Sequence, residues 1–157
     1  MVRIANRPVL DEQGYATGIL KNVNLGEGTR IEKKGRNVDH TKYDRYEFTF
    51  EIEGKTGEPL EIKLHTGTVL NDEPVKILAK TRGKKEQQKI YNRFTSICLS
   101  LGVISIGELE RSDITTSKLE DIELQLKNLH ELPVKVKMGK NDEGYWVVDP
   151  QNITKLL

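Results

Sequence analysis

The sequence contains a single cysteine, Cys98, among its 157 residues, and it has no long apolar run. One thiol allows neither an internal disulfide nor a cysteine-rich metal site, and its apolar neighbours predict that it is buried. No segment approaches the ~20 apolar residues of a membrane helix, and the first 20 residues lack the basic-then-apolar pattern of a signal peptide. We therefore expect one soluble, cytoplasmic domain over residues 1–157, with no membrane partner.

Recognisable catalytic and cofactor motifs are also missing. There is no Walker-type phosphate loop, and Gly26-Glu27-Gly28 lacks the third glycine of a dinucleotide loop. The histidines His40, His65 and His130 lie far apart, without the short spacing of metal ligands. We predict no catalytic residue, no metal, no cofactor and no enzymatic activity. Clusters of carboxylates leave a metal-dependent nuclease as a weaker alternative.

The small net charge of +1 hides two basic segments. Residues 21–45 carry a net charge of +3 and residues 76–93 a net charge of +6, and the balancing acidic residues lie elsewhere. Local clustering, more than the total, attracts a polyanion. Solvated loops without a partner would explain the same pattern, so charge alone does not decide the function.

Alternation of apolar and polar residues predicts five strands. The clearest case is Tyr46, Phe48 and Phe50, which alternate with polar residues and therefore face inward in a half-buried strand. Gly26-Glu27-Gly28 suggests a bulge or bend, and we interpret residues 29–44 as a long, partly extended connection. The predicted strands cover residues 16–25, 45–53, 59–66, 133–139 and 144–149.

Two helices are predicted between the third and fourth strands. Apolar residues recur at three- and four-residue spacing over residues 86–101, which indicates an amphipathic helix ended by Gly102. A second helix over residues 117–129 would be capped by Ser117 and ended by Pro133. The order of elements predicts a mainly β, α+β fold, an OB-like five-stranded Greek-key barrel with a helix between strands 3 and 4.

Aromatic residues accompany the basic segments, and together they favour binding of single-stranded nucleic acid. Basic side chains release counterions from a phosphate backbone, and exposed rings stack on bases. Of the adjacent Tyr145 and Trp146, one ring must point outward, and we favour Trp146. Acidic residues Glu47, Glu51 and Glu53 on the outer side of their strand would repel phosphate, so binding is expected to avoid that end. The candidate nucleic-acid-binding residues are Arg30, Lys33, Lys34, Arg36, Lys42, Tyr43, Arg45, Lys63, Lys80, Arg82, Lys84, Lys85, Lys89, Tyr91, Arg93, Lys135, Lys137, Lys140, Tyr145 and Trp146, with His65 as a further cationic position.

The strand order, the basic connection, the helical insertion and the ending LPVKVKMGKNDEGYWVV (residues 132–148) resemble the small single-stranded DNA-binding proteins of phages and mobile elements. The resemblance implies an OB fold and sequence-tolerant coating of single strands in replication or recombination, in the host cytoplasm. The long Gly/Pro/Gln-rich tail of many bacterial members is missing, so tail-mediated docking is not implied. RNA binding and homo-oligomerisation stay open. The alternative function is a protein-interaction or structural barrel with no nucleic-acid role.

Overall fold

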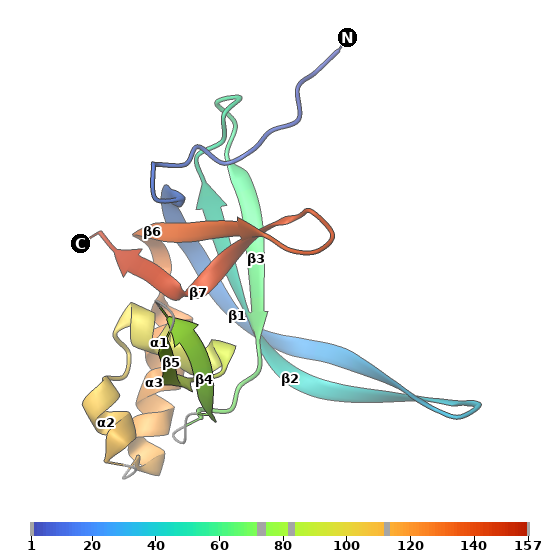
Figure 1. The fold of residues 1–157 in the computed structure, drawn as a ribbon, viewed down its shortest axis with the longest axis vertical. Helices are drawn as coiled ribbons and strands as arrows, with labels where there is room; N and C mark the ends of the chain where they lie inside the picture. The colour runs from blue at the N-terminus through green and yellow to red at the C-terminus, as the bar shows by residue number, and fades with distance from the viewer. Residues whose placement is uncertain (1, 72–74, 82–83, 112–113, 157) are drawn as a thin grey trace.

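The computed structural model describes residues 2–71, 75–81, 84–111 and 114–156, with segments 75–81 and 84–90 described by their backbone alone. One antiparallel sheet contains all five predicted strands in the order β3-β2-β1-β6-β7 (Figure 1). These strands are β1 (Tyr15–Lys34), β2 (Asn37–Ile52), β3 (Leu60–Thr66), β6 (His130–Lys140) and β7 (Trp146–Lys155). The edge strands β3 and β7 contact each other but form no hydrogen-bonded ladder in the described residues. The five strands are thus confirmed, whereas closure into a barrel stays a prediction.

Strand β1 is the central strand because it pairs on both sides. Residues 18–34 pair with β2, and residues 15–22 pair with β6. Gly18 permits the close approach of β2, because a Cβ atom there would lie 2.2 Å from the carbonyl oxygen of Glu51. The predicted bend at residues 26–28 is wrong: these residues pair regularly with residues 43–45, and the bulge lies between Leu20 and Asn22.

Residues 29–44, expected as a connection, instead continue the β1–β2 ladder as a two-stranded arm. The ladder runs to the pair Lys34–Asn37 and closes through a two-residue turn. Gly35 at the first turn position has a φ of 64°, the geometry that a type II′ turn requires of glycine. We call residues 25–46 the arm; Figure 1 shows it projecting beyond the rest of the molecule.

The core lies on the inner face of the sheet and continues into the helices, which lie together at one end of it, beside β7 (Figure 1). The inward orientation of the β2 aromatics is confirmed, since Tyr46, Phe48 and Phe50 are all buried. Helix α1 (Arg93–Leu101) packs against β7, and the ring of its Phe94 stacks on Tyr46 with 5.2 Å between centroids. This stack connects the base of the arm to the helical layer.

The helix predicted over residues 86–101 is shorter than expected. Asn92 caps α1 by accepting a hydrogen bond from the Thr95 backbone N–H at 2.8 Å, so the helix begins at Arg93. Residues 84–90 form a strand, β5 (Lys84–Ile90), which pairs with β4 (Val75–Thr81) in a separate two-stranded sheet. Gly102, with φ 74°, ends α1 as predicted.

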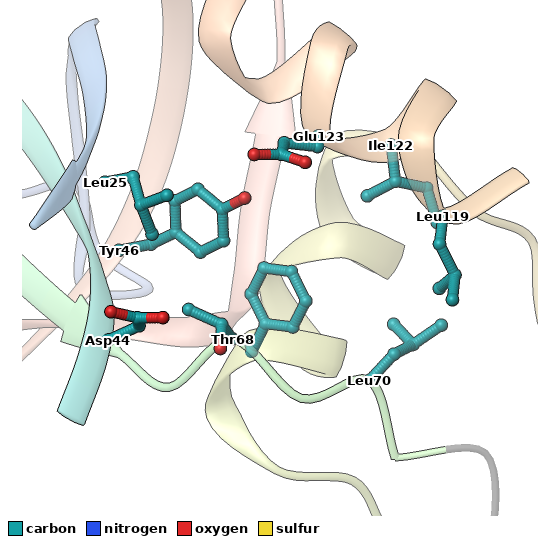
Figure 2. A pocket seen from close by; sticks show the side chains of 9 residues that line it. Leu25, Asp44, Tyr46, Thr68, Leu70, Leu119, Ile122 and Glu123 are labelled. Carbon is teal, nitrogen blue, oxygen red and sulfur yellow. The ribbon is translucent and has the colours of Figure 1, made fainter. Parts of the chain in front are cut away.

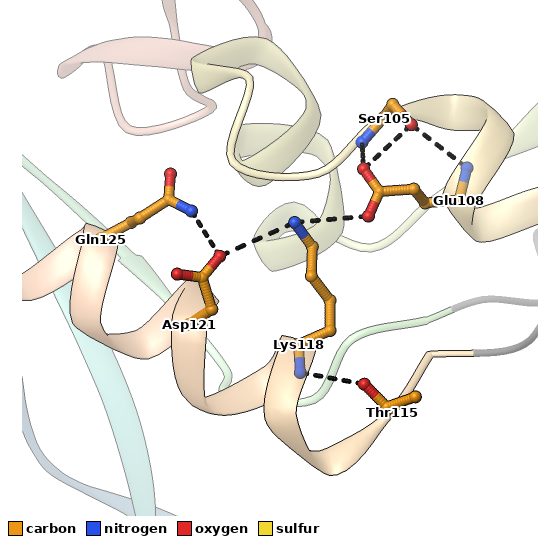
Figure 3. Close-up of polar contacts among 6 residues, drawn as sticks. All are labelled: Ser105, Glu108, Thr115, Lys118, Asp121 and Gln125. Carbon is orange, nitrogen blue, oxygen red and sulfur yellow. Dashed lines mark hydrogen bonds and ion pairs between the residues drawn. The ribbon is translucent and has the colours of Figure 1, made fainter.

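Two further helices complete the layer, α2 (Ile106–Glu110) and α3 (Thr116–Asn128). Ser105 and Glu108 form a capping box at the start of α2. Lys118 of α3 joins the two helices, with its Nζ 3.3 Å from Glu108 and 3.8 Å from Asp121 (Figure 3). Hydrogen bonds from the Ser105 backbone and hydroxyl lower the pKa of Glu108, which keeps this carboxylate charged for the pair.

The second predicted helix, 117–129, is confirmed to within one residue at each end, but its predicted cap is wrong. Its cap is Thr115, whose hydroxyl oxygen accepts a hydrogen bond from the Lys118 backbone N–H at 3.1 Å, and not Ser117. The helix ends at Asn128 with Leu129 as its C-cap, and Pro133, predicted to end it, lies four residues further on in β6. A cap two residues earlier suits the sequence equally, since Thr and Ser are both good caps.

Replacing the observed cap tests this assignment. We expect Thr115→Ala to lower the free energy of unfolding by ~1 kcal/mol, the usual cost of losing a cap. Ser117→Ala is the matched control and should change it by less than ~0.5 kcal/mol, because Ser117 is exposed. Urea denaturation of both variants measures the difference. Equal losses would show that Thr115 is not the cap.

Cys98 is expected to be chemically inert in the folded protein. The thiol is fully buried, and burial raises its pKa to about 12, so little reactive thiolate forms at neutral pH. Labelling by a thiol reagent should therefore be slow in buffer and fast in denaturant. Rapid labelling of the native protein would contradict this environment for Cys98.

Candidate nucleic-acid interface

A groove with a volume of about 390 Å³ lies at the base of the arm and is lined by three arginines. Its lining comes from β1, β2, the end of β3 and the start of α1. Five predicted residues meet here although they come from distant parts of the sequence: Arg30, Tyr43, Arg45, His65 and Arg93. The lining residues are Arg30, Tyr43, Arg45, His65, Thr66, Gly67 and Arg93.

The β1–β2 register places an aromatic ring beneath one of the arginines. Tyr43 pairs with Gly28 and Arg45 with Gly26, so alternate residues of both strands share one face of the arm. The guanidinium of Arg30 lies 5.5 Å from the centre of the Tyr43 ring. A Cβ atom on Gly28 would lie 2.5 Å from that ring. Gly28 therefore lets the ring lie across the strand.

The three arginines of this groove are available for an anion. Within the described ranges of the chain, no carboxylate lies at ion-pair distance from Arg30, Arg45 or Arg93. A guanidinium presents several N–H donors in a plane and suits the bidentate recognition of phosphate. The Tyr43 side of the groove is open, because 37% of this residue is exposed.

The neighbouring acidic residues are partly neutralised by adjacent cations. Glu47 accepts a hydrogen bond from His65 Nε2 at 2.8 Å and lies 3.3 Å from Lys63 Nζ. The hydrogen bond with His65, followed by that with Lys63, lowers the pKa of Glu47. Glu51 similarly pairs with Lys21 at 3.6 Å. The predicted cations Lys63 and His65 are therefore already engaged with Glu47, while the adjacent groove retains arginines that have no carboxylate partner in the described residues.

The preference for Trp146 as the outward ring is wrong. Trp146 is half-buried against the core, with Lys140 Nζ 4.9 Å from its ring centre, whereas Tyr145 is 66% exposed. The regular alternation on which the prediction depended starts only at Trp146, because Tyr145 lies in the preceding turn. Trp146 and Lys140 line a separate groove of about 410 Å³ together with Arg7 and residues 4–6.

The other predicted cations are dispersed. Lys135 pairs with Asp11 at 3.1 Å and lies over the Tyr15 ring, and Lys137 is exposed. Tyr91 is half-buried against the core. Exposed basic residues of the arm are Lys33, Lys34, Arg36 and Lys42, of which Lys34 pairs with Asp39 at 3.6 Å. Arg82 and the side chains of Lys80, Lys84, Lys85 and Lys89 lie outside the described part.

Sequence reasoning missed the residues that shape the groove. Gly28 becomes significant only when the register shows Tyr43 opposite it. Thr66 and Gly67 follow a predicted strand, but no sequence signal directs them toward the arginines. Arg7 of the second groove lies before the first strand and carries no recognisable motif.

Comparisons of the chain with protein-family models, with curated proteins and with solved structures found no match. No helix in the described ranges is long and apolar enough to cross a membrane. The same residues contain no group of three His, Cys, Asp or Glu side chains arranged to hold a metal ion.

The contact between Glu47 and His65 predicts a dependence of stability on acid pH. Because folding lowers the pKa of Glu47, its contribution is complete above the unfolded pKa, near 4.5, and disappears as the pH falls through the folded pKa. Glu47→Gln should destabilise the protein by ~0.2–1 kcal/mol at pH 6, as expected for an exposed ion pair. The difference from wild type should shrink below pH 4.5.

Denaturant titrations from pH 3 to pH 7 measure this difference. Glu53→Gln is the control, because Glu53 is exposed and forms no ion pair with the described residues of this sheet face. A Glu47→Gln deficit that stays constant down to pH 3 would contradict the lowered pKa.

Proposed function

We propose that this chain binds single-stranded DNA, with little sequence preference, through the groove at the base of the arm. The observation that carries the proposal is the set of three arginines, without carboxylate partners in the described residues, around the open Tyr43 ring. Guanidinium groups supply phosphate contacts and the ring supplies a stacking surface. Neither interaction distinguishes one base strongly from another, which accounts for sequence tolerance.

The sheet supports this proposal through its connectivity. We infer an OB-type barrel because β1 pairs with both β2 and β6, while the remaining strands β3 and β7 contact each other at the open edge. Helices separate the third and fourth strands of this sheet, as in OB folds. Such barrels bind oligonucleotides on the face of strands 2 and 3 and on adjacent loops. The groove lies where β2, the end of β3 and the arm meet.

Single strands suit this groove better than duplexes. Their bases are unstacked and can reach a ring such as Tyr43, whereas duplex bases are stacked within the helix. RNA offers the same phosphates and base faces, so it is the appropriate comparison ligand. The alternative is an interaction module in which the arginines bind an acidic partner protein. That alternative requires charge but makes no use of an exposed ring.

The first experiment is a fluorescence-anisotropy titration at two salt concentrations. The ligands are single-stranded DNA of about 20–30 nucleotides, longer than the usual site of one barrel, with RNA and duplex DNA of equal length. We expect salt-dependent binding that is strongest for a single strand. No binding of any nucleic acid would favour the interaction module, and equal binding of duplex and single strand would argue against stacking.

Two substitutions separate electrostatic from stacking contributions. Arg45→Gln should weaken binding on all sequences and flatten the slope of log K against log salt by ~0.7 for each phosphate that the protein no longer neutralises. Tyr43→Leu should cost ~1–3 kcal/mol of binding free energy with a nearly unchanged slope, because stacking releases few ions. Arg111→Gln is the charge control, since this exposed arginine lies at the end of α2.

The glycines of the arm provide a control for the position of the ring. Gly28→Ala should reproduce most of the Tyr43→Leu loss, because the new methyl group displaces the ring. Gly26→Ala has open space around its Cβ and should bind as wild type. Thermal melts establish that each variant is folded. Unchanged affinity for folded Tyr43→Leu and Gly28→Ala would contradict stacking on Tyr43.

A further inference from the structure

A second hollow, with a volume of about 290 Å³, lies between the base of the arm and α3 (Figure 2). Most of its wall is apolar, and two of its leucines, Leu25 and Leu119, are 45% and 46% exposed. The stacked rings of Tyr46 and Phe94 form part of the wall. We call it the arm-base pocket; its lining residues are Leu25, Asp44, Tyr46, Thr68, Leu70, Phe94, Leu119, Ile122 and Glu123.

The charged groups of the arm-base pocket are both acidic. Its charged residues are the two carboxylates Asp44 and Glu123, and its lining includes no basic side chain among the described residues. Figure 2 shows the Tyr46 hydroxyl directed toward Glu123. Glu123 also pairs with Lys127 at 3.0 Å, whereas Asp44 has no ion pair within the described part of the molecule. A fitting occupant therefore combines apolar side chains with neighbouring positive charge.

The tip of the arm has this combination. Ile31 is 60% exposed and Val38 is 50% exposed, although both are large apolar residues. Ile31 pairs with His40 and Lys33 with Val38, so the two apolar side chains are diagonal neighbours on one face. Lys33 is on the same face, and Arg36 lies in the turn. The tip thus presents a small apolar surface with Lys33 beside it and Arg36 in the adjoining turn.

The tip and the arm-base pocket lie on the same face of the arm but far apart. Leu25 and Ile31 are six residues apart in a regularly paired strand, so they share a face and are separated by ~20 Å. A continuous ladder cannot fold back over that distance onto its own base. The tip of an arm therefore cannot reach the arm-base pocket of its own chain, and only the tip of a second copy could occupy it.

We propose that the arm tip of a second copy of this chain occupies the arm-base pocket. Ile31 and Val38 contact the apolar wall, and Lys33 approaches Asp44 and Glu123. Because tip and pocket share one face, two arms aligned antiparallel, face to face, satisfy both contacts at once. This is a closed two-fold dimer, in which each contact occurs twice. The opposite face, which carries Arg30 and Tyr43, stays accessible to nucleic acid.

Sedimentation equilibrium of the full chain without nucleic acid tests the dimer independently of the proposed function. Wild type should change from monomer to dimer with concentration, and Ile31→Glu should raise the dissociation constant at least tenfold. Thr41→Glu is the matched control, because Thr41 is also β-branched and exposed but pairs with Arg30 on the other face. A monomer at all concentrations, or equal effects of both variants, would overturn the proposal, as would growth into larger oligomers.

A disulfide between subunits identifies the contact directly. Lys33→Cys and Leu119→Cys chains, mixed under mild oxidation, should form a covalent heterodimer. The native Cys98 does not interfere, because it is buried. Lys34→Cys in place of Lys33→Cys is the control, since adjacent residues of a strand face opposite sides. Equal cross-linking from residues 33 and 34 would show that the contact is not specific.

Discussion

The pairing of β1 along its whole length is the constraint on which the rest of the structure depends. Its first half lies between β2 and β6 and helps to bury the core, while its second half pairs with β2 alone and forms the arm. Gly18 allows the close approach of β2 in the first half, and Gly35 turns the chain at the end of the second. One uninterrupted strand therefore connects the folded body to a solvent-exposed extension.

The register of this strand also separates the two proposed surfaces. On one face of the arm, Gly28 accommodates the Tyr43 ring beneath Arg30. On the other face, Leu25 contributes to the arm-base pocket and Ile31 is exposed near the tip. A shift of the ladder by one residue would exchange these faces, because side chains alternate along a strand. Proposed nucleic-acid binding and proposed self-association thus depend on the same hydrogen bonds.

The sequence predicts the parts of the fold in which one side faces the core. Alternation identifies the strand around Phe48 and Phe50, and helical spacing identifies the surroundings of Cys98, because burial imposes an apolar period. The outer arm has solvent on both faces, so no apolar alternation distinguishes it from a loop. Ile90 lies at a helical spacing from Phe94, which made the predicted helix begin too early. In the structure the cap at Asn92 sets the start of the helix at Arg93.

The candidate groove was only partly predictable from the sequence. Charge and residue type do not separate Arg30 and its neighbours in the groove from dispersed cations such as Lys135, because tertiary contacts decide which cation has a carboxylate partner.

Photo-cross-linking of the wild-type protein to oligothymidine containing bromouracil tests the central claim most directly. A base stacked on a ring is placed for cross-linking to it, so we expect attachment to the peptide that contains Tyr43. Mass spectrometry of the digested complex locates the attachment, and added salt should reduce its yield. Attachment confined to Tyr145 or Trp146, or no attachment at low salt, would contradict binding at the base of the arm.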